Sequence, residues 1–351
     1  MELGRIGIWT PALRTRRPKA PEPIAEAVAE LEELGYGAIW LGGSPGVQSA
    51  RVLIEASSRI VVATGILSVW DHPASEVAAQ HRALAHDHPG RFLLGLGISH
   101  GPAVGDRYRR PYATMMSYLD ELDAAGVPAA ERVLAALGPK MLAAARDRAA
   151  GAHPYLVTPE HTHRARQVLG DGPLLAPEVK VVLDTDLERG RRSARDHLSF
   201  YLQLPNYTNN LLRLGFTEED FAGGGSDRLI DAVFAIGDVE AAERRIAEHF
   251  QAGADHAAVQ VITADYRTLP LEQWRALAPL AKQCPRRPRG APPAGAPRGV
   301  RTCGGAAGGG GPGPGPATGG GAARRSRSGR RRPGRRPVRR PPAPRRGRRW
   351  R

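Results

Sequence analysis

The 351-residue chain carries a formal net charge of +15, but residues 284–351 alone contain 20 Arg and no Lys, Asp or Glu, which leaves −5 for residues 1–283. Both cysteines, Cys284 and Cys303, lie in the basic segment, which excludes a disulfide framework and thiolate chemistry in residues 1–283. The sequence shows no basic and apolar signal peptide and no run of about 18 apolar residues, so we expect a cytoplasmic protein without membrane contact.

The first part of the chain predicts strands and helices in strict alternation. Short apolar runs predict strands over residues 3–9, 38–43, 60–67 and 91–101. Helical periodicity predicts helices between them: from Pro21 to Gly35, over 47–57, and from Pro73 to the turn at 87–91. Such alternation implies right-handed crossovers and a parallel sheet.

The same pattern continues to residue 283. Further strands are predicted over 132–138, 152–157, 174–184 (interrupted by Pro177) and 257–262. Helices are predicted over 112–126, 139–151, 159–170, 187–204, 227–236, 239–254 and 271–283, with a loop and a short helix in 205–227. Eight strands, each followed by a helix, in about 280 residues indicate a (β/α)8 TIM barrel, an α/β fold. An open doubly wound sheet is the alternative, although such a sheet rarely needs eight repeats.

Residues 284–351 differ in composition from this barrel domain of residues 1–283. They hold 17 Gly and 13 Pro and few apolar residues other than Ala, so they cannot bury a core and are predicted to be disordered. One interpretation is an arm that binds nucleic acid through its arginines. The other is an accidental extension, such as out-of-frame translation. Two features favour the second: lysine is absent, and the boundary falls immediately after the last barrel helix.

Candidate site residues follow the predicted strands, because active sites of such barrels lie at the carboxyl ends of the strands. Polar, aromatic and small residues follow the third strand at Ser68, Val69, Trp70 and His72, and end the fourth at Gly97, Ser99 and His100. Small residues let a ligand approach the backbone, and the serine and histidine supply polar atoms. No carboxylate pair or acidic cluster is present, which argues against a hydrolase or a divalent-metal centre.

A possible phosphate site follows the fifth strand at Gly138, Pro139, Lys140 and Met141. The N–H groups that open a helix, its dipole and a nearby cation all favour an anion, although the same residues also suit a routine strand-to-helix corner. His153, His161 and His163 do not predict a metal site, because residues two apart on a helix do not face the same way.

The segment HPASEVAAQHRALAHDHPGRFLLGLGIS resembles the luciferase-like monooxygenase family, specifically its coenzyme F420-dependent branch. The segments IWLGGSPG, ALGPKMLAAA, GAHPYLVTPEHT, LPNYTNNLLRLGF and GGGSDRLIDA are similar to one subgroup of that branch. His88 stands where the family usually has serine. The resemblance covers residues 1 to about 283 and not the basic segment.

The resemblance implies a deazaflavin, coenzyme F420, at the carboxyl rim of a TIM barrel, exchanging a hydride with a small organic substrate. It implies His100 and His72 as proton donors or acceptors, and a non-prolyl cis peptide at Ser68–Val69. The cofactor would contact Ser68, Val69, Trp70, Gly97, Ser99, Gly138, Pro139, Lys140, Met141 and His153. The alternatives are FMN with O2 in place of F420, and a cofactor-binding barrel without catalysis. A homodimer is common in the family, and we expect nucleic acid to bind, if at all, only through the basic segment.

Overall fold

The computed structural model describes residues 1–265 and 268–283. Its strands are β1 (Ile6–Thr10), β2 (Ala38–Leu41), β3 (Val61–Thr64), β4 (Leu67–Ser68), β5 (Phe92–Gly97), β6 (Arg132–Leu134), β7 (Gly151–Ala152), β8 (Leu174–Leu175), β9 (Glu178–Leu183), β10 (Phe234–Gly237) and β11 (Ala257–Val261). They pair in parallel in the order β10-β9-β11-β1-β2-β3-β5-β6-β7-β8, and β4 pairs with the end of β5. The described sheet is therefore parallel throughout, as the alternation of strands and helices predicts.

The segment that contains β8 and β9 closes the ring of strands. On one side, the Glu178 N–H donates to the Pro154 carbonyl oxygen at 2.8 Å. On the other side, the Ala258 N–H donates to the carbonyl oxygen of Pro177 at 3.0 Å. Pro177 has no N–H of its own, which fits the break between β8 and β9. The segment counts as one barrel strand, so the predicted (β/α)8 barrel is confirmed.

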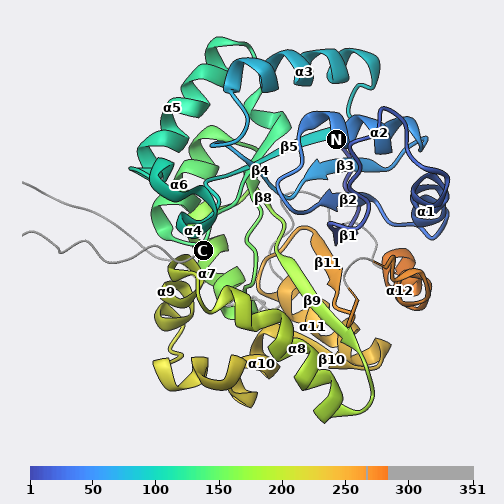
Figure 1. Cartoon of the computed structure of the whole chain (residues 1–351), viewed down its shortest axis with the longest axis vertical. Coiled ribbons are helices and arrows are strands. Elements are labelled where there is room, and N and C mark those ends of the chain that lie inside the picture. The colour runs from blue at the N-terminus through green and yellow to red at the C-terminus, as the bar shows by residue number, and fades with distance from the viewer. Residues whose placement is uncertain (266–267, 284–351) are drawn as a thin grey trace, which may run out of the picture. The chain divides into compact units, whose positions relative to one another are not determined.

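Helices surround this ring of strands (Figure 1). They are α1 (Glu22–Glu33), α2 (Val47–Glu55), α3 (Ala74–Asp87), α4 (Gly101–Val104), α5 (Pro111–Ala124), α6 (Pro139–Arg148), α7 (Pro159–Leu169), α8 (Leu187–Tyr201), α9 (Pro205–Arg213), α10 (Asp227–Val233), α11 (Val239–Gln251) and α12 (Leu271–Gln283). Short 3-10 turns occupy Gly105–Arg107, Ala129–Glu131 and Glu218–Gly224. Among the residues described, no helix is both long and apolar enough to cross a membrane.

One predicted helix is partly wrong. The sequence predicts a helix over 227–236, but α10 ends at Val233 and Phe234–Gly237 forms β10 beside β9. Phe234 has φ −110° and ψ 141°, and its side chain is buried. The apolar run through this region suits either a helix or a strand, and pairing with β9 decides the outcome. The predicted disorder of residues 284–351 lies outside the described residues.

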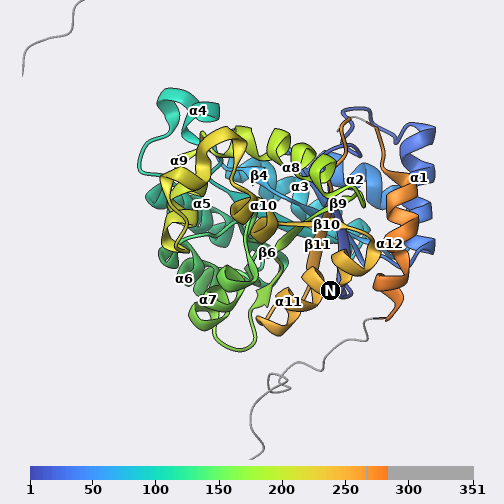
Figure 2. The same cartoon turned by 90° about the horizontal axis from the view of Figure 1, so that it is seen from below.

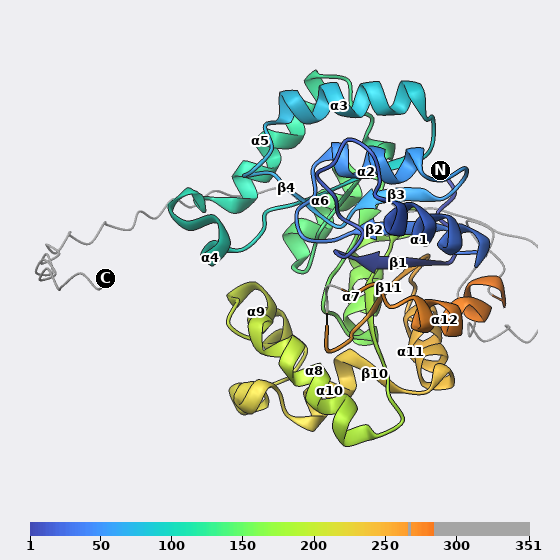
Figure 3. The same ribbon diagram turned by 45° about the vertical axis from the view of Figure 1, so that its right-hand side comes forward.

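The loops at the carboxyl ends of the strands carry the added helical elements. Figures 2 and 3 show α4, α8 and α9 gathered at one end of the barrel, away from the N-terminus. The helices α8 and α9 form part of the chain between barrel strands β9 and β11. Side chains from several distant segments therefore meet over this end of the barrel.

Candidate functional site

A cavity of about 1060 Å³ opens at the carboxyl ends of the strands. Its described lining comes from the ends of most barrel strands and from α8 and α9: Trp9, Thr10, Pro11, Ala12, Gly43, Ser44, Gly65, Ile66, Gly97, Ile98, Ser99, His100, Tyr108, Ala135, Ala136, Leu137, Gly138, Met141, His153, Tyr155, Asp196, His197, Phe200, Tyr201, Asn206, Tyr207, Asn209, Arg213, Gln260, Val261, Ile262, Thr263, Thr268 and Pro270. Most of these residues are apolar or aromatic. Its position agrees with the site expected for such a barrel.

The end of β5 brings three predicted residues, Gly97, Ser99 and His100, to the cavity. Ser99 has φ 52°, a left-handed conformation that turns the chain into α4, for which His100 is the N-cap. The His100 ring lies 5.4 Å from the ring of Tyr207, between centroids. Burial lowers the pKa of His100, and a hydrogen bond with the Asn206 side chain opposes that shift. Its Nδ1 atom has no hydrogen-bond partner among the described residues.

The cis peptide lies at Gly65–Ile66, so its predicted position at Ser68–Val69 is wrong. The chain leaves β3 at Thr64, and the cis bond precedes the short strand β4 rather than following it. Gly65 and Ile66, not Ser68 and Val69, are the residues of this segment that line the cavity.

Residues 68–70, from the end of β4 onward, support the cavity wall from outside. The Val69 N–H donates to the Gly97 carbonyl oxygen at 3.0 Å, and Trp70 Nε1 donates to the Ile98 carbonyl oxygen at 2.6 Å. The Ser68 N–H donates to Ser44 Oγ at 3.1 Å. The geometry therefore places Ser68, Val69 and Trp70 behind the cavity wall.

The second predicted histidine is also outside the cavity lining. The carbonyl oxygen of His72 accepts a hydrogen bond from the Tyr118 hydroxyl at 2.9 Å. His72 and His100 are therefore not brought together in the cavity, although both follow strands of the same barrel.

The start of α6 forms another part of the lining. Gly138 is the N-cap of α6 and Pro139 its first residue, and Gly138 and Met141 line the cavity. Lys140 is exposed and, like Pro139, is not part of the lining. Arg213, at the end of α9, reaches this point, because a Cβ at Gly138 would lie 3.9 Å from Arg213 Nη2. A helix N-terminus and a guanidinium therefore meet at one edge of the cavity.

Three tyrosines from two distant segments form an aromatic wall. The Tyr155 and Tyr201 hydroxyls lie 2.8 Å apart, and the Tyr201 and Tyr207 rings are 5.3 Å apart in an edge-to-face arrangement. Burial raises the pKa of Tyr201 to about 12 and raises that of Tyr155 well above its usual value. These hydroxyls are therefore neutral at pH 7.

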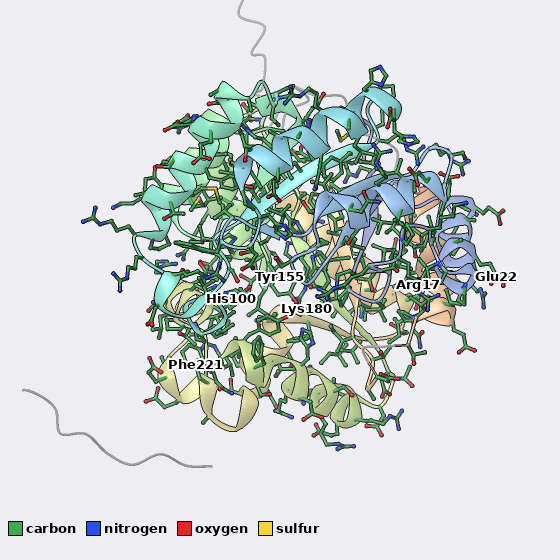
Figure 4. The ribbon with its side chains drawn as sticks, turned by 45° about the horizontal axis from the view of Figure 1, so that its top comes forward. Arg17, Glu22, His100, Tyr155, Lys180 and Phe221 are labelled. Carbon is green, nitrogen blue, oxygen red and sulfur yellow. The ribbon has the colours of Figure 1, made fainter. Side chains whose placement is uncertain are left out.

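A buried ion pair lies directly behind this wall. Lys180 Nζ is 2.7 Å from Glu178 Oε1, and both side chains are fully buried. The same nitrogen lies 3.8 Å from the centre of the Tyr155 ring and 3.3 Å from Gln260 Oε1. Figure 4 shows His100, Tyr155 and Lys180 gathered in one region of the barrel. The two opposite charges leave this end of the cavity without net charge.

His153 is held in the wall by a ring stack and one hydrogen bond. Its ring stacks on Trp40, with centroids 4.2 Å apart, and its Nδ1 lies 2.7 Å from the Ala176 carbonyl oxygen. Its Nε2 atom has no hydrogen-bond partner among the described residues. Burial lowers the pKa of His153 to about 4 and that of His197 to about 3. Both rings are therefore neutral at pH 7.

The cavity combines two chemically different ends. The inner end is aromatic and neutral, whereas Arg213 and the start of α6 make one edge positive. Asp196 is the one carboxylate among its described lining residues. Within residues 1–265 and 268–283, no group of three or more His, Cys, Asp or Glu side chains is arranged to hold a metal ion. The arrangement suits a flat organic ring with an anionic tail.

The sequence reasoning missed the contribution of α8 and α9. Tyr201, Tyr207 and Arg213 follow no barrel strand directly, so their place depends on how the helices fold back over the barrel. Lys180 and Glu178 did carry a signal. Two charged residues at i and i+2 in an otherwise apolar strand face the same side, and burial then requires a partner.

Comparisons with known proteins agree with this architecture. The model of the family described as luciferase-like monooxygenase matches residues 1–256. A search of curated proteins found no match.

Solved structures are similar at low identity. An F420-dependent secondary alcohol dehydrogenase in complex with an F420-acetone adduct is 13% identical, with a TM-score of 0.61 over 79% of this chain and 99% of that chain. A coenzyme F420 dependent tetrahydromethanopterin reductase from Methanopyrus kandleri is 15% identical, with a TM-score of 0.61 over 79% and 98%. The oxygenating constituent of 3,6-diketocamphane monooxygenase from Pseudomonas putida, in complex with FMN, is 14% identical, with a TM-score of 0.56 over 80% and 97%. At these identities the likeness shows the shared fold.

Proposed function

Because this chain belongs to the luciferase-like monooxygenase family, we propose that it is an oxidoreductase that binds coenzyme F420 in the cavity and acts on a small organic substrate. The observation that carries the proposal is the two-ended cavity, in which a neutral aromatic end adjoins an edge with Arg213 and the start of α6. Coenzyme F420 has two matching parts, a flat ring and a tail with a phosphate and carboxylates. When bound, it supplies a hydride acceptor or donor.

The described residues fit such a ring. Gly97 presents backbone rather than a side chain to the cavity, and Ile66 fills the space that a side chain would need, since a Cβ on Gly97 would lie 2.6 Å from Ile66 Cδ1. At the far edge, Gly138 and Met141 would lie beside the tail, with Arg213 as the counter-charge. Lys140, exposed in the first turn of α6, would add a second positive charge beyond the phosphate.

His100 is the residue that we propose moves the proton that accompanies the hydride. It lines the cavity, its pKa is lowered by burial, and its Nδ1 is free of partners among the described residues. The ring is therefore neutral at pH 7 and can take a proton. His72 lies outside the lining, so we expect His100→Ala to reduce turnover at least about 100-fold and His72→Ala to reduce it little.

The binding experiment compares F420 with FO, which has the same ring and sugar-alcohol chain but no phosphate tail. Fluorescence titration of the full chain should give tight F420 binding, and Arg213→Ala should weaken F420 roughly tenfold while leaving FO unchanged. Arg82→Ala, an exposed arginine on α3, is the matched control. Tight binding of FMN without binding of F420 would replace the proposal with a flavin-dependent monooxygenase.

A further inference from the structure

A chain of hydrogen bonds leads from the buried Lys180 to the cavity wall. Lys180 Nζ donates to Gln260 Oε1 at 3.3 Å, and the Tyr155 hydroxyl donates to the same oxygen at 2.9 Å. The Tyr155 hydroxyl lies 2.8 Å from that of Tyr201, which lines the cavity. The outermost group of this chain is thus a tyrosine hydroxyl that a bound molecule can reach.

The direction of this chain is fixed by the chemistry of its inner end. An ammonium group only donates, so the Gln260 atom that faces Lys180 is the amide oxygen, which only accepts. The single Tyr155 proton is directed to that oxygen. The bond between the two tyrosines must then use the Tyr201 proton, with Tyr155 as acceptor. The Tyr201 oxygen is left with lone pairs alone for a ligand.

His153 carries a second unpaired acceptor atom among the residues that line the cavity. A carbonyl oxygen only accepts, so the 2.7 Å contact with Ala176 places the ring proton on Nδ1. The neutral ring then presents a bare lone pair at Nε2, which is buried and has no partner among the described residues. The residue is 1% exposed, so leaving this atom unpaired is unfavourable.

We propose that Tyr201 Oη accepts a hydrogen bond from the substrate, and that the substrate is an uncharged molecule that carries a hydroxyl group. The lone pairs on Tyr201 Oη repel a carboxylate or a phosphate. The charge of Lys180 does not attract such anions, because Glu178 is 2.7 Å away and both are fully buried. The assignment to substrate rests on the proposed function, in which the same cavity also holds the cofactor ring.

The test uses phenol, anisole and benzoate as probes of the full chain, with dissociation constants from ligand-observed NMR titration. Phenol donates a hydrogen bond, anisole has the hydroxyl methylated, and benzoate is an anion. We expect phenol to bind at least about tenfold more tightly than either of the others. Tyr201→Phe should reduce the ratio of phenol affinity to anisole affinity severalfold. Tyr112→Phe, which changes an exposed tyrosine on α5, should leave this ratio unchanged.

FO affinity, measured on the same variants, separates this proposal from the proposed function. Unchanged FO binding in Tyr201→Phe, with the phenol preference lost, supports the assignment to substrate. Weakened FO binding with an intact phenol preference would overturn it, because the acceptor would then serve the cofactor ring. Equal binding of phenol and anisole, or no phenol binding, by a protein that binds FO would also overturn it. A phenol preference without any binding of F420 or FO would count against the proposed function alone.

Discussion

The Cδ1 atom of Ile66 lies where it leaves no room for a side chain on Gly97: a Cβ there would be 2.6 Å away. Both residues line the cavity, one after β3 and the other at the end of β5. The shape of the cavity wall at this point therefore depends on the absence of a side chain at residue 97.

Gly97→Ala should preserve the fold and weaken binding of the deazaflavin ring. The nearest atoms to the new Cβ belong to the Ile66 side chain, which lines the cavity, so relieving the contact requires that side chain to shift. We expect a loss of stability of about 1–3 kcal/mol and a decrease in FO affinity of at least about tenfold. Thermal denaturation and fluorescence titration measure the two effects.

Gly95→Ala is the informative comparison on the same strand. There a Cβ would lie 1.9 Å from the Thr64 carbonyl oxygen, a backbone atom that cannot move aside. We expect this variant to lose far more stability than Gly97→Ala. If Gly97→Ala binds FO with the same affinity as the unaltered chain, the role proposed for Gly97 in binding the cofactor ring is wrong.

Removal of residues 284–351 should leave the cofactor affinity unchanged. The family match ends at residue 256, and every lining residue of the cavity that the structure describes lies before residue 271. The 20 arginines of the removed segment should give the full chain an affinity for DNA that falls steeply with salt. Titration of both forms with F420 and with duplex DNA at two salt concentrations measures this. A truncated form that has lost F420 binding but remains folded would contradict the prediction.

The barrel could be predicted because each buried parallel strand is a separate apolar run in the sequence, as in residues 91–101. The strand Phe234–Gly237 could not, since its apolar residues continue those of α10 and only the hydrogen bonds to β9 distinguish the two structures. The position of the cis peptide was carried over from a family pattern. The correct position, Gly65–Ile66, lies three residues earlier, before β4.

The candidate site was predictable at some strand ends, but not at the end of the third predicted strand, where Ser68, Val69, Trp70 and His72 lie outside the cavity lining. Gly97, Ser99, His100 and Gly138 were located from the strand ends alone, and the structure places them on the cavity. Tyr201 reaches it from the end of α8, and periodicity along a helix does not indicate what a distant helix end covers. Their roles in binding and catalysis remain predictions that the variants above test.

Acid should weaken the fold through Glu32, at the opposite end of the barrel from the cavity. Burial alone would raise the pKa of Glu32, but hydrogen bonds from the Ser58 side chain and the N–H groups of residues 58–60 outweigh it and lower the pKa to about 2. The pKa of the folded state is thus below the unfolded value of 4.5, so this stability is present above pH 4.5 and is lost as the pH falls toward 2.

We expect Glu32→Gln to lose about 3 kcal/mol at pH 7 and much less near pH 2, because one pKa unit corresponds to about 1.4 kcal/mol. Glu33→Gln, an exposed neighbour on the same helix, is the control. Urea denaturation across this pH range measures the difference. An equal loss at both ends of the range would show that the charge of Glu32 is not the stabilising feature.

Lys180→Met should be strongly destabilising, because it leaves the fully buried Glu178 carboxylate without its cation. Breaking such a pair costs roughly 3–5 kcal/mol. Burial raises the pKa of Glu178, and this effect outweighs the lowering of the pKa by Lys180. Without Lys180 the pKa of Glu178 should rise further. The folded value would then exceed the unfolded one, so the protonated form favours folding and the penalty should shrink as the pH falls from 8 toward 5.

The double variant Lys180→Met with Glu178→Gln should recover most of the loss, since glutamine can still accept the Leu156 N–H hydrogen bond made by Glu178 Oε2 at 3.1 Å. Urea denaturation at pH 5 and pH 8 tests both expectations, and a double variant no more stable than the single one would contradict them.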